Sequence, residues 1–199
     1  RQVHRRVVDE AVHNLSHSSG SLWREGLEDE GPAGDAARRE AERAILVSKR
    51  QEFDSLGVVL GSRYERSPVL AHEPEGADEP WDSTRYVQTA RPGCRAPHAW
   101  LAPGHGQGAS LFDHFAFRGL TLLATRPAAR DAAQALAAQA AGAGIPLTVI
   151  APPVDGLREL YGADLALIRP DQYVAWRGHD PGEGAAALEL AAGRAAVHA

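Results

Sequence analysis

The stretch YVQTARPGCRAPHAW, residues 86–100, divides the sequence into two halves of different character. Before it lie charged helical patterns and a polar segment rich in Pro and Asp. After it, short apolar runs alternate with Ala-rich helical patterns, which is typical of an α/β fold. The stretch ends in apolar residues, and we expect residues 96–101 to form a strand.

The half that follows predicts a regular order of elements from residue 119 onward. Along the chain these are the strands 120–125 and 146–151, the helices 127–143, 157–161 and 184–197, and a hairpin of strands 165–169 and 172–177. A short helix is expected to start at Ser110. The order strand, helix, strand, helix, hairpin, helix is thioredoxin-like, with a right-handed crossover joining two parallel strands. We therefore predict an α/β, thioredoxin-like domain over residues 86–199.

The half that precedes predicts two helices and a polar loop. Apolar residues at helical spacing indicate a helix over residues 3–16, and Asp35 is a suitable N-cap for a second helix ending near residue 53. Residues 56–64 are expected to form a strand or an extended crossover. Residues 67–85 are expected to be a polar linker in which Trp81 packs. Both helices are long and have only a narrow apolar face, so we expect residues 1–66 to pack against a surface that this chain does not contain.

Composition excludes several classes of function. The net charge is -5 and the pI is about 6.0, so no basic surface for nucleic acid is expected. No apolar run reaches the roughly 18 residues that a membrane span needs. Cys94 is the single cysteine, which rules out an intrachain disulfide and fits a reducing, cytoplasmic compartment. The chain contains no Met, even at position 1, so we expect a fragment or a processed piece of a longer protein.

Two kinds of cysteine chemistry fail on the sequence. A thioredoxin-type dithiol would lie in residues 125–130, after the first predicted core strand, and no cysteine is there. A hydrolase using Cys94 as nucleophile and His98 as base would need an oxyanion hole and an orienting group, and neither is identifiable. We therefore interpret Cys94 as an ordinary half-buried cysteine in a turn.

Two other candidate sites are also weak. His98, His105, Asp113 and His114 lie close in sequence, but their spacing matches no compact metal-ligand pattern. The loop GHGQG, residues 104–108, has neither the glycine spacing of a dinucleotide fingerprint nor a Gly-Lys-Ser/Thr motif. We interpret the histidines as surface residues and the loop as a turn.

Four motifs together resemble the C-terminal part of FAD-dependent aromatic hydroxylases, the phenol-hydroxylase-like flavoprotein monooxygenases that include polyketide hydroxylases. They are FDSLGVVLGSRYERSPVL (53–70), YVQTARPGCRAPHAWL (86–101), SLFDHFAFRGLTLLAT (110–125) and GADLALIRPDQYVAWRG (162–178). The resemblance implies a thioredoxin-like domain without redox cysteines, preceded by helices that pack on the flavin domain. It also implies a parent enzyme that uses FAD, NAD(P)H and O2 to add one oxygen to an electron-rich aromatic ring.

The motifs by which that family binds FAD, an N-terminal GxGxxG turn and later Asp-Gly and Gly-Asp motifs, do not occur in this sequence. We therefore assign no catalytic, cofactor-binding or metal-binding residue to this chain and expect it to bind no FAD alone. Its expected partner is the flavin-binding domain, in cis or in trans, and a homodimer is open. The alternative is a stand-alone, non-catalytic thioredoxin-like binding or assembly module. The aromatic substrate and the choice between NADH and NADPH stay open.

Overall fold

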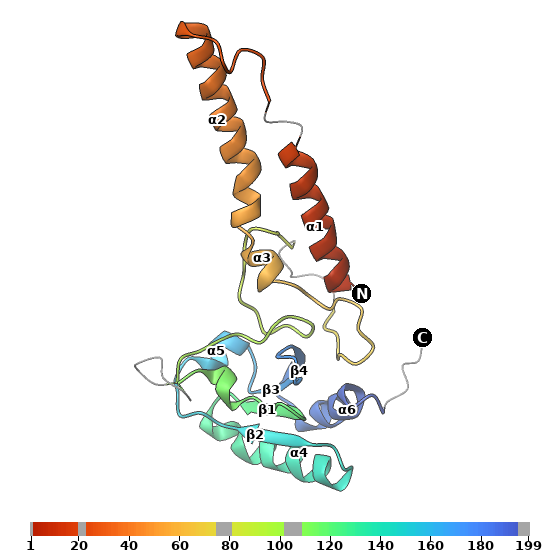
Figure 1. Cartoon of the computed structure of the whole chain (residues 1–199). Coiled ribbons are helices and arrows are strands. Elements are labelled where there is room, and N and C mark those ends of the chain that lie inside the picture. The colour runs from red at the N-terminus through yellow and green to blue at the C-terminus, as the bar shows by residue number, and fades with distance from the viewer. Residues whose placement is uncertain (1, 20–22, 75–80, 102–108, 195–199) are drawn as a thin grey trace. The chain divides into compact units, whose positions relative to one another are not determined.

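The computed structural model describes residues 2–19, 23–74, 81–101 and 109–194. The chain divides into two compact units. The first, which we call the helical unit, comprises Arg1–Ser62 and Glu79–Val87, and the second, the sheet unit, comprises Arg63–Asp78 and Gln88–Ala199. Figure 1 shows both units, and each is described by itself.

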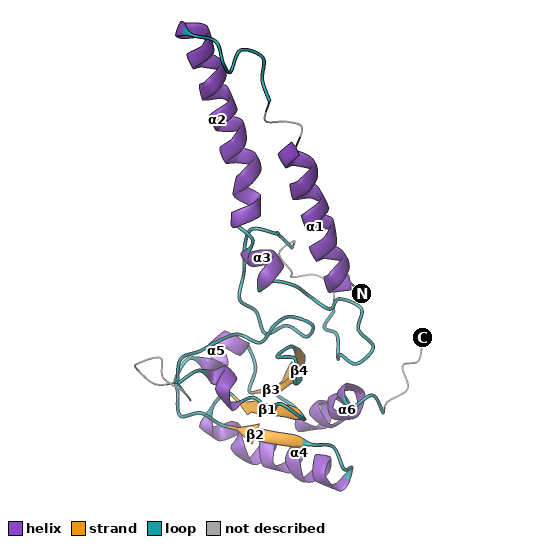
Figure 2. Cartoon of the chain, in the orientation of Figure 1, coloured by secondary structure: helices purple, strands orange, loops and turns teal. Residues whose placement is uncertain are grey.

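The helical unit contains α1 (Gln2–Ser19), α2 (Gly31–Phe53) and the single turn α3 (Leu56–Val59) (Figure 2). The two long helices were predicted, but α2 begins earlier than the sequence suggests. Its N-cap is Glu30 and a proline stands in its first turn, where the missing N–H needs no partner. Asp35 is therefore inside the helix, and its carboxylate pairs with Arg38 at 2.6 Å, so the prediction of Asp35 as N-cap is wrong.

Residues 56–59 form a helical turn, so the prediction of a strand there is wrong. The turn is held by the segment that returns to it from far along the chain. Val58 N donates to Ser83 O at 3.1 Å. A Cβ on Gly57 would lie 1.7 Å from Asp82 O, so only glycine allows this backbone approach. The LGVVLG pattern predicts a strand because a local sequence pattern does not encode these long-range contacts with Asp82 and Ser83.

Trp81 packs within the helical unit, as predicted. Its indole Nε1 donates to Gly57 O at 3.2 Å. The guanidinium of Arg6 on α1 lies 5.1 Å from the centroid of the Trp81 ring, a cation–π distance. One aromatic side chain thus links α1 and α3.

The sheet unit has the element order that the sequence predicts. It contains the strands β1 (Leu120–Ala124), β2 (Leu147–Ile150), β3 (Leu165–Ile168) and β4 (Val174–Gly178), the α-helices α4 (Arg130–Gly142), α5 (Leu157–Tyr161) and α6 (Pro181–Ala191), and the 3₁₀ helices η1 (Leu111–His114) and η2 (Pro127–Ala129). The strands lie in the order β2-β1-β3-β4. β1 is parallel to β2 and antiparallel to β3, and β3 is antiparallel to β4.

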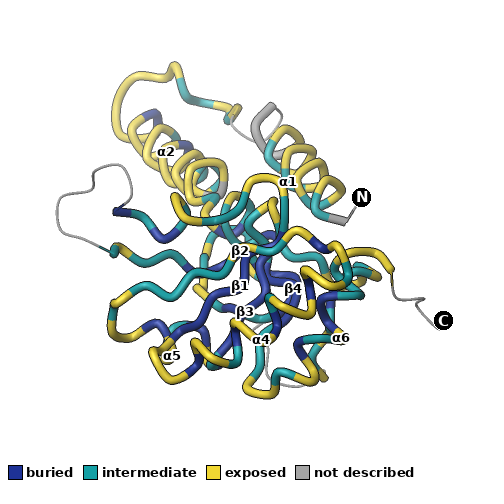
Figure 3. The backbone as a smooth tube through the Cα atoms, turned by 90° about the horizontal axis from the view of Figure 1, so that it is seen from below, coloured by how far each residue is buried: buried dark blue, intermediate teal, exposed yellow. Residues whose placement is uncertain are grey.

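Apolar side chains bury both faces of the sheet. In β1, Leu120 and Leu122 belong to a cluster that includes residues of α4 and α6, whereas Leu123 belongs to a second cluster that includes residues of α5 and η1. This alternation follows from the period of two along a strand. Because both faces are covered, every residue of β1 is buried (Figure 3). A continuous apolar run such as LTLLA is what such a central strand requires.

Two predicted elements differ from the structure. Residues 96–101 form no strand; only isolated bridges at Arg95 and Trp100 are present, and Pro97 has no N–H to give a ladder. The closing helix α6 begins at Pro181 rather than at residue 184, because Asp180 caps it by accepting from Gly182 N at 2.7 Å. It ends at Ala191, before Gly193 with its φ of 71°. The last part of the predicted helix, residues 195–197, lies outside the described residues.

No helix within the described ranges is both long enough and apolar enough to cross a membrane.

Candidate functional site

The RPGCRAP segment, residues 91–97, lies along the outer edge of β4 and is joined to it by backbone hydrogen bonds. Gly93 N donates to Val174 O at 2.8 Å, Val174 N donates to Cys94 O at 3.0 Å, and Ala96 N donates to Gln172 O at 2.8 Å. Gly93 has a φ of 91°. A Cβ there would lie 2.5 Å from the carbonyl oxygen of Tyr64, so the glycine is required by both conformation and space.

Cys94 is more deeply buried than predicted, with 7% of its surface exposed. Its carbonyl takes part in the edge pairing described above, which makes its backbone part of the sheet. A buried thiol behaves as a small apolar side chain, whereas a catalytic cysteine needs an accessible, polar environment. The structure thus gives Cys94 a packing role.

The same segment is joined to α5 by one buried hydroxyl. Tyr161 is 0% exposed, and its Oη donates to Pro97 O at 2.7 Å. Pro97 is also fully buried, so this carbonyl has no access to solvent. The bond therefore fixes the position of residues that lie 64 apart in the sequence.

His98 is held at the start of η1. Its Nε2 lies 3.0 Å from Ser110 Oγ, and its ring packs edge-on against Trp100 and Phe112 with centroids 4.7 and 5.2 Å apart. Ser110 Oγ also accepts from Phe112 N, and Ser110 N donates to Asp113, which completes a capping box. At the N-terminus of η1, Ser110 therefore contacts His98 through its side chain and Asp113 through its backbone N–H.

Four residues were considered as metal ligands. Two of them, His98 and Asp113, both contact Ser110. His114 is the exposed last residue of η1. His105 lies outside the described residues, as does the whole GHGQG loop, residues 104–108. Among the residues that the structure describes, no three His, Cys, Asp or Glu side chains form a group that could hold a metal ion.

A cluster of charges lies at the end of β1, where a thioredoxin-type dithiol would stand. Asp164, only 13% exposed, precedes β3. Arg126 binds it with both Nε and Nη2, at 2.7 and 2.6 Å. Arg158 of α5 donates to its Oδ1 at 2.9 Å, and His179, which follows β4, lies 3.2 Å from its Oδ2.

The electrostatics of this cluster are those of a structural ion pair. The hydrogen bonds from Arg126, then those from Arg158 and His179, hold the pKa of the Asp164 carboxyl well below its usual range, against the opposing effect of burial. A carboxylate that stays ionised and saturated with donors cannot act as a base near neutral pH. The cluster therefore ties together the ends of β1, β3 and β4. Sequence reasoning missed it because its members come from separate segments.

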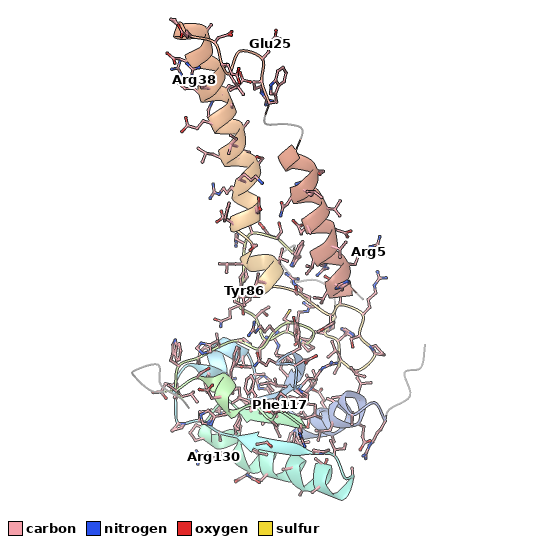
Figure 4. All side chains as sticks on the ribbon, viewed as in Figure 1. Arg5, Glu25, Arg38, Tyr86, Phe117 and Arg130 are labelled. Carbon is pink, nitrogen blue, oxygen red and sulfur yellow. The ribbon has the colours of Figure 1, made fainter. Side chains whose placement is uncertain are left out.

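Large apolar side chains are exposed on each of the three helices of the helical unit, and we call this set of residues the helical apolar surface. They are Val7, Val8, Val12 and Leu15 on α1, Ile45, Leu46, Val47 and Phe53 on α2, and Leu56 and Val59 on α3. Their exposure reaches 77% at Val47 and 80% at Phe53. Figure 4 shows the side chains on these helices, with Arg5 labelled on α1 and Arg38 on α2. Contiguous exposed apolar side chains mark interaction sites in many proteins.

A family model described as "Aromatic-ring hydroxylase, C-terminal" matches residues 89–196, more than half of the chain. The chain belongs to this family. The matched range of the hydroxylase C-terminal domain contains the RPGCRAP segment, the whole sheet and the Asp164 cluster. The resemblance inferred from the four sequence motifs is thus confirmed.

Curated relatives of this chain are monooxygenases. The chain is 28% identical over 166 residues to 2,4-dichlorophenol 6-monooxygenase of Delftia acidovorans, and the match covers 76% of this chain and 27% of that protein. The chain is 36% identical over 130 residues to aklavinone 12-hydroxylase RdmE of Streptomyces purpurascens, and the match covers 60% of this chain and 23% of that protein. The chain spans about a quarter of the length of these relatives.

Solved structures extend the match to the helical unit. The rebeccamycin biosynthetic enzyme RebC with reduced flavin has a TM-score of 0.80 and 33% identity, covering 97% of this chain and 35% of that one. The flavin-dependent monooxygenase PieE, in complex with FAD and substrate, has a TM-score of 0.71 and 27% identity, covering 96% and 38%. The hydroxylase domain and the helices before it therefore recur together in these larger chains.

Proposed function

We propose that this chain is the C-terminal part of an FAD- and NAD(P)H-dependent monooxygenase that hydroxylates a phenolic or polyketide aromatic ring. The family match and the names of the relatives support the reaction class. The chain covers only about a quarter of the length of those relatives, which supports the view that the oxidation is carried out by a larger enzyme of which this chain is one part. When bound to the parent, FAD supplies the oxygen chemistry.

We propose that this chain has no FAD site of its own. A dinucleotide pyrophosphate is bound by a glycine-rich turn between a strand and a helix N-terminus. The turn between β1 and α4, residues 125–129, contains no glycine and has Pro127 at its centre. The neighbouring Arg126 is already committed to Asp164. The turn after β1 therefore lacks the glycine-rich cradle that a dinucleotide pyrophosphate needs, which supports the proposal, and no catalytic step is assigned to this chain.

We also infer that the sheet unit is a thioredoxin-like domain without a redox site. The inference is supported by the strand order β2-β1-β3-β4, with β3 antiparallel to the others, and by the element order along the chain. The single cysteine is on the edge of β4 rather than after β1. Such a domain would supply scaffold rather than electron transfer.

The observation that carries the proposed role is the helical apolar surface. Burying apolar area is worth about 25 cal/mol per Å², so ten exposed large side chains represent a substantial driving force for docking. We propose that residues 1–66 pack against the flavin-binding domain through this surface, in cis or in trans. The sheet unit is then held beside the flavin domain as a rigid support.

The deciding experiment is the native mass and the absorbance spectrum of the species that carries this sequence. The proposal expects a larger polypeptide or complex with flavin absorbance. A lone, colourless, folded chain would favour the alternative, a non-catalytic binding or assembly module. An isolated chain that retains FAD stoichiometrically would overturn both.

A second experiment tests the surface itself. We expect the isolated chain to bind the apolar dye ANS, and Leu46→Ser combined with Val47→Ser to reduce the dye fluorescence. Glu42→Ser is the matched control, because Glu42 is exposed on the same helix. Equal fluorescence in the double variant and the control would contradict docking through this surface.

A further inference from the structure

A hollow of about 280 Å³ lies at the end of the sheet unit where β1 and β2 begin. Its walls come from the start of β1, the start of β2, the turn between β3 and β4, and the end of α6. The lining includes Arg118, Leu120, Ile145, Pro146, Ala192 and Arg194. All of them belong to one compact unit. Drug-sized ligands occupy about 300 Å³ or more, so this hollow suits a smaller molecule.

The lining combines an apolar wall with two positive charges and no acid. Pro146 is exposed and contributes most of the apolar surface, whereas Leu120 and Ile145 are core residues that show only 6% and 5% of their surface. None of the lining residues is Asp or Glu. Neither Arg118 nor Arg194 forms an ion pair with a carboxylate of the described residues. The hollow therefore has an uncompensated positive charge beside an apolar surface.

The two arginines differ in how they are held. Arg194 donates to the carbonyl oxygens of Ala143 and Gly144, at the end of α4, the latter at 3.3 Å. These bonds fix its guanidinium in place but leave its charge without an acidic partner. Arg118 is exposed and makes no hydrogen bond to any described residue. Arg118 is thus available to a ligand, and Arg194 offers a fixed positive field.

We propose that this hollow binds a small organic carboxylate with an apolar body, such as an aromatic acid. A guanidinium binds a carboxylate through two parallel hydrogen bonds, and the apolar wall covers the rest of the molecule. A neutral apolar ligand would cover Arg118 without a partner, which costs free energy. An inorganic oxyanion would leave the apolar wall exposed to water. This inference does not depend on the proposed function, because it uses only residues of the sheet unit.

The test is a titration of the whole chain with benzoate, followed by NMR of the backbone amides. We expect saturable shifts at Gly119, Leu120 and Ala192, with a Kd of roughly 1 mM, as is usual for a ligand of this size. Benzyl alcohol and inorganic phosphate are the matched probes, since one lacks the charge and the other the ring. Both are expected to bind at least about ten-fold more weakly, the factor that corresponds to one charged hydrogen bond.

Variants locate the binding. Arg118→Gln is expected to weaken benzoate binding by about ten-fold or more. Arg130→Gln is the control, because Arg130 is also an exposed arginine of the sheet unit but donates to Ala151 O, away from the hollow. Ala192→Leu, which fills the hollow without removing charge, is expected to weaken binding as well. The proposal is overturned if benzoate shifts map elsewhere, if the control weakens binding as much as Arg118→Gln, or if phosphate or benzyl alcohol binds as tightly as benzoate.

Discussion

Removal of one oxygen atom from Tyr161 tests whether the RPGCRAP segment is fixed by the bond to α5. In Tyr161→Phe the ring still fills its buried site, but Pro97 O loses the donor that stands 2.7 Å away. A buried carbonyl without a partner costs about 1–3 kcal/mol, and we take about 2 kcal/mol as the expected loss of unfolding free energy.

Native-state amide exchange is the suitable assay, because the chain has two units and a single unfolding curve would mix them. The slowest amides of β1 and β3 report unfolding of the sheet unit. A loss of about 2 kcal/mol makes them exchange about 30-fold faster. The control is Tyr64→Phe, since the Tyr64 ring packs on Tyr173 at 4.6 Å while its hydroxyl has no hydrogen-bond partner among the described residues. If both variants change exchange by the same factor, the reasoning is refuted.

Three further changes probe other parts of the sheet unit. Gly184→Ala would place a Cβ 2.8 Å from Leu136 Cδ1 inside the core, and we expect a loss of about 1–3 kcal/mol, measured from the exchange of the slowest β1 and β3 amides. Ser110→Ala removes the capping oxygen of η1, and the expected loss of about 0.5–2 kcal/mol should appear as faster exchange of the Phe112 amide. The pKa of Asp164 is lowered in the folded state, so its stabilising effect is present above the ordinary value of 3.8 and is lost as the pH falls below it. The difference in stability between the native chain and Asp164→Asn, measured from pH 7 to pH 3, should therefore shrink at the acid end, and a constant difference would contradict it.

The sequence was sufficient to predict the elements whose secondary structure is determined by the burial of their side chains. The apolar run of β1 and the hairpin of β3 and β4 are recognisable because a central strand must be apolar on both faces and a hairpin needs a turn between two such runs. Helix α5 was predicted with its observed bounds. By contrast, α3 was missed because its form depends on Gly57 meeting the backbone of Asp82, a contact that no local pattern encodes.

The candidate sites were less predictable than the fold. The rejection of a dithiol needed only the position of Cys94, which the sequence supplies. The Asp164 cluster and the hollow beside Arg118 are assembled from side chains that are distant in the sequence, and each of these residues is an unremarkable charged residue in its own segment. Only the folded arrangement shows which charges meet a partner and which do not.

The outer edges of the sheet, at β4 and β2, affect whether a strand of another chain can pair with it. An unpaired strand edge is a template for cross-chain association and fibril growth. The edge of β4 is occupied by the irregular segment around Gly93 and Pro97, which uses its hydrogen-bonding groups without offering a regular new edge. At the opposite edge, β2 has only four residues and is preceded by Pro146 and followed by Pro152. Prolines and short length thus make both edges of the sheet poor templates for a further strand.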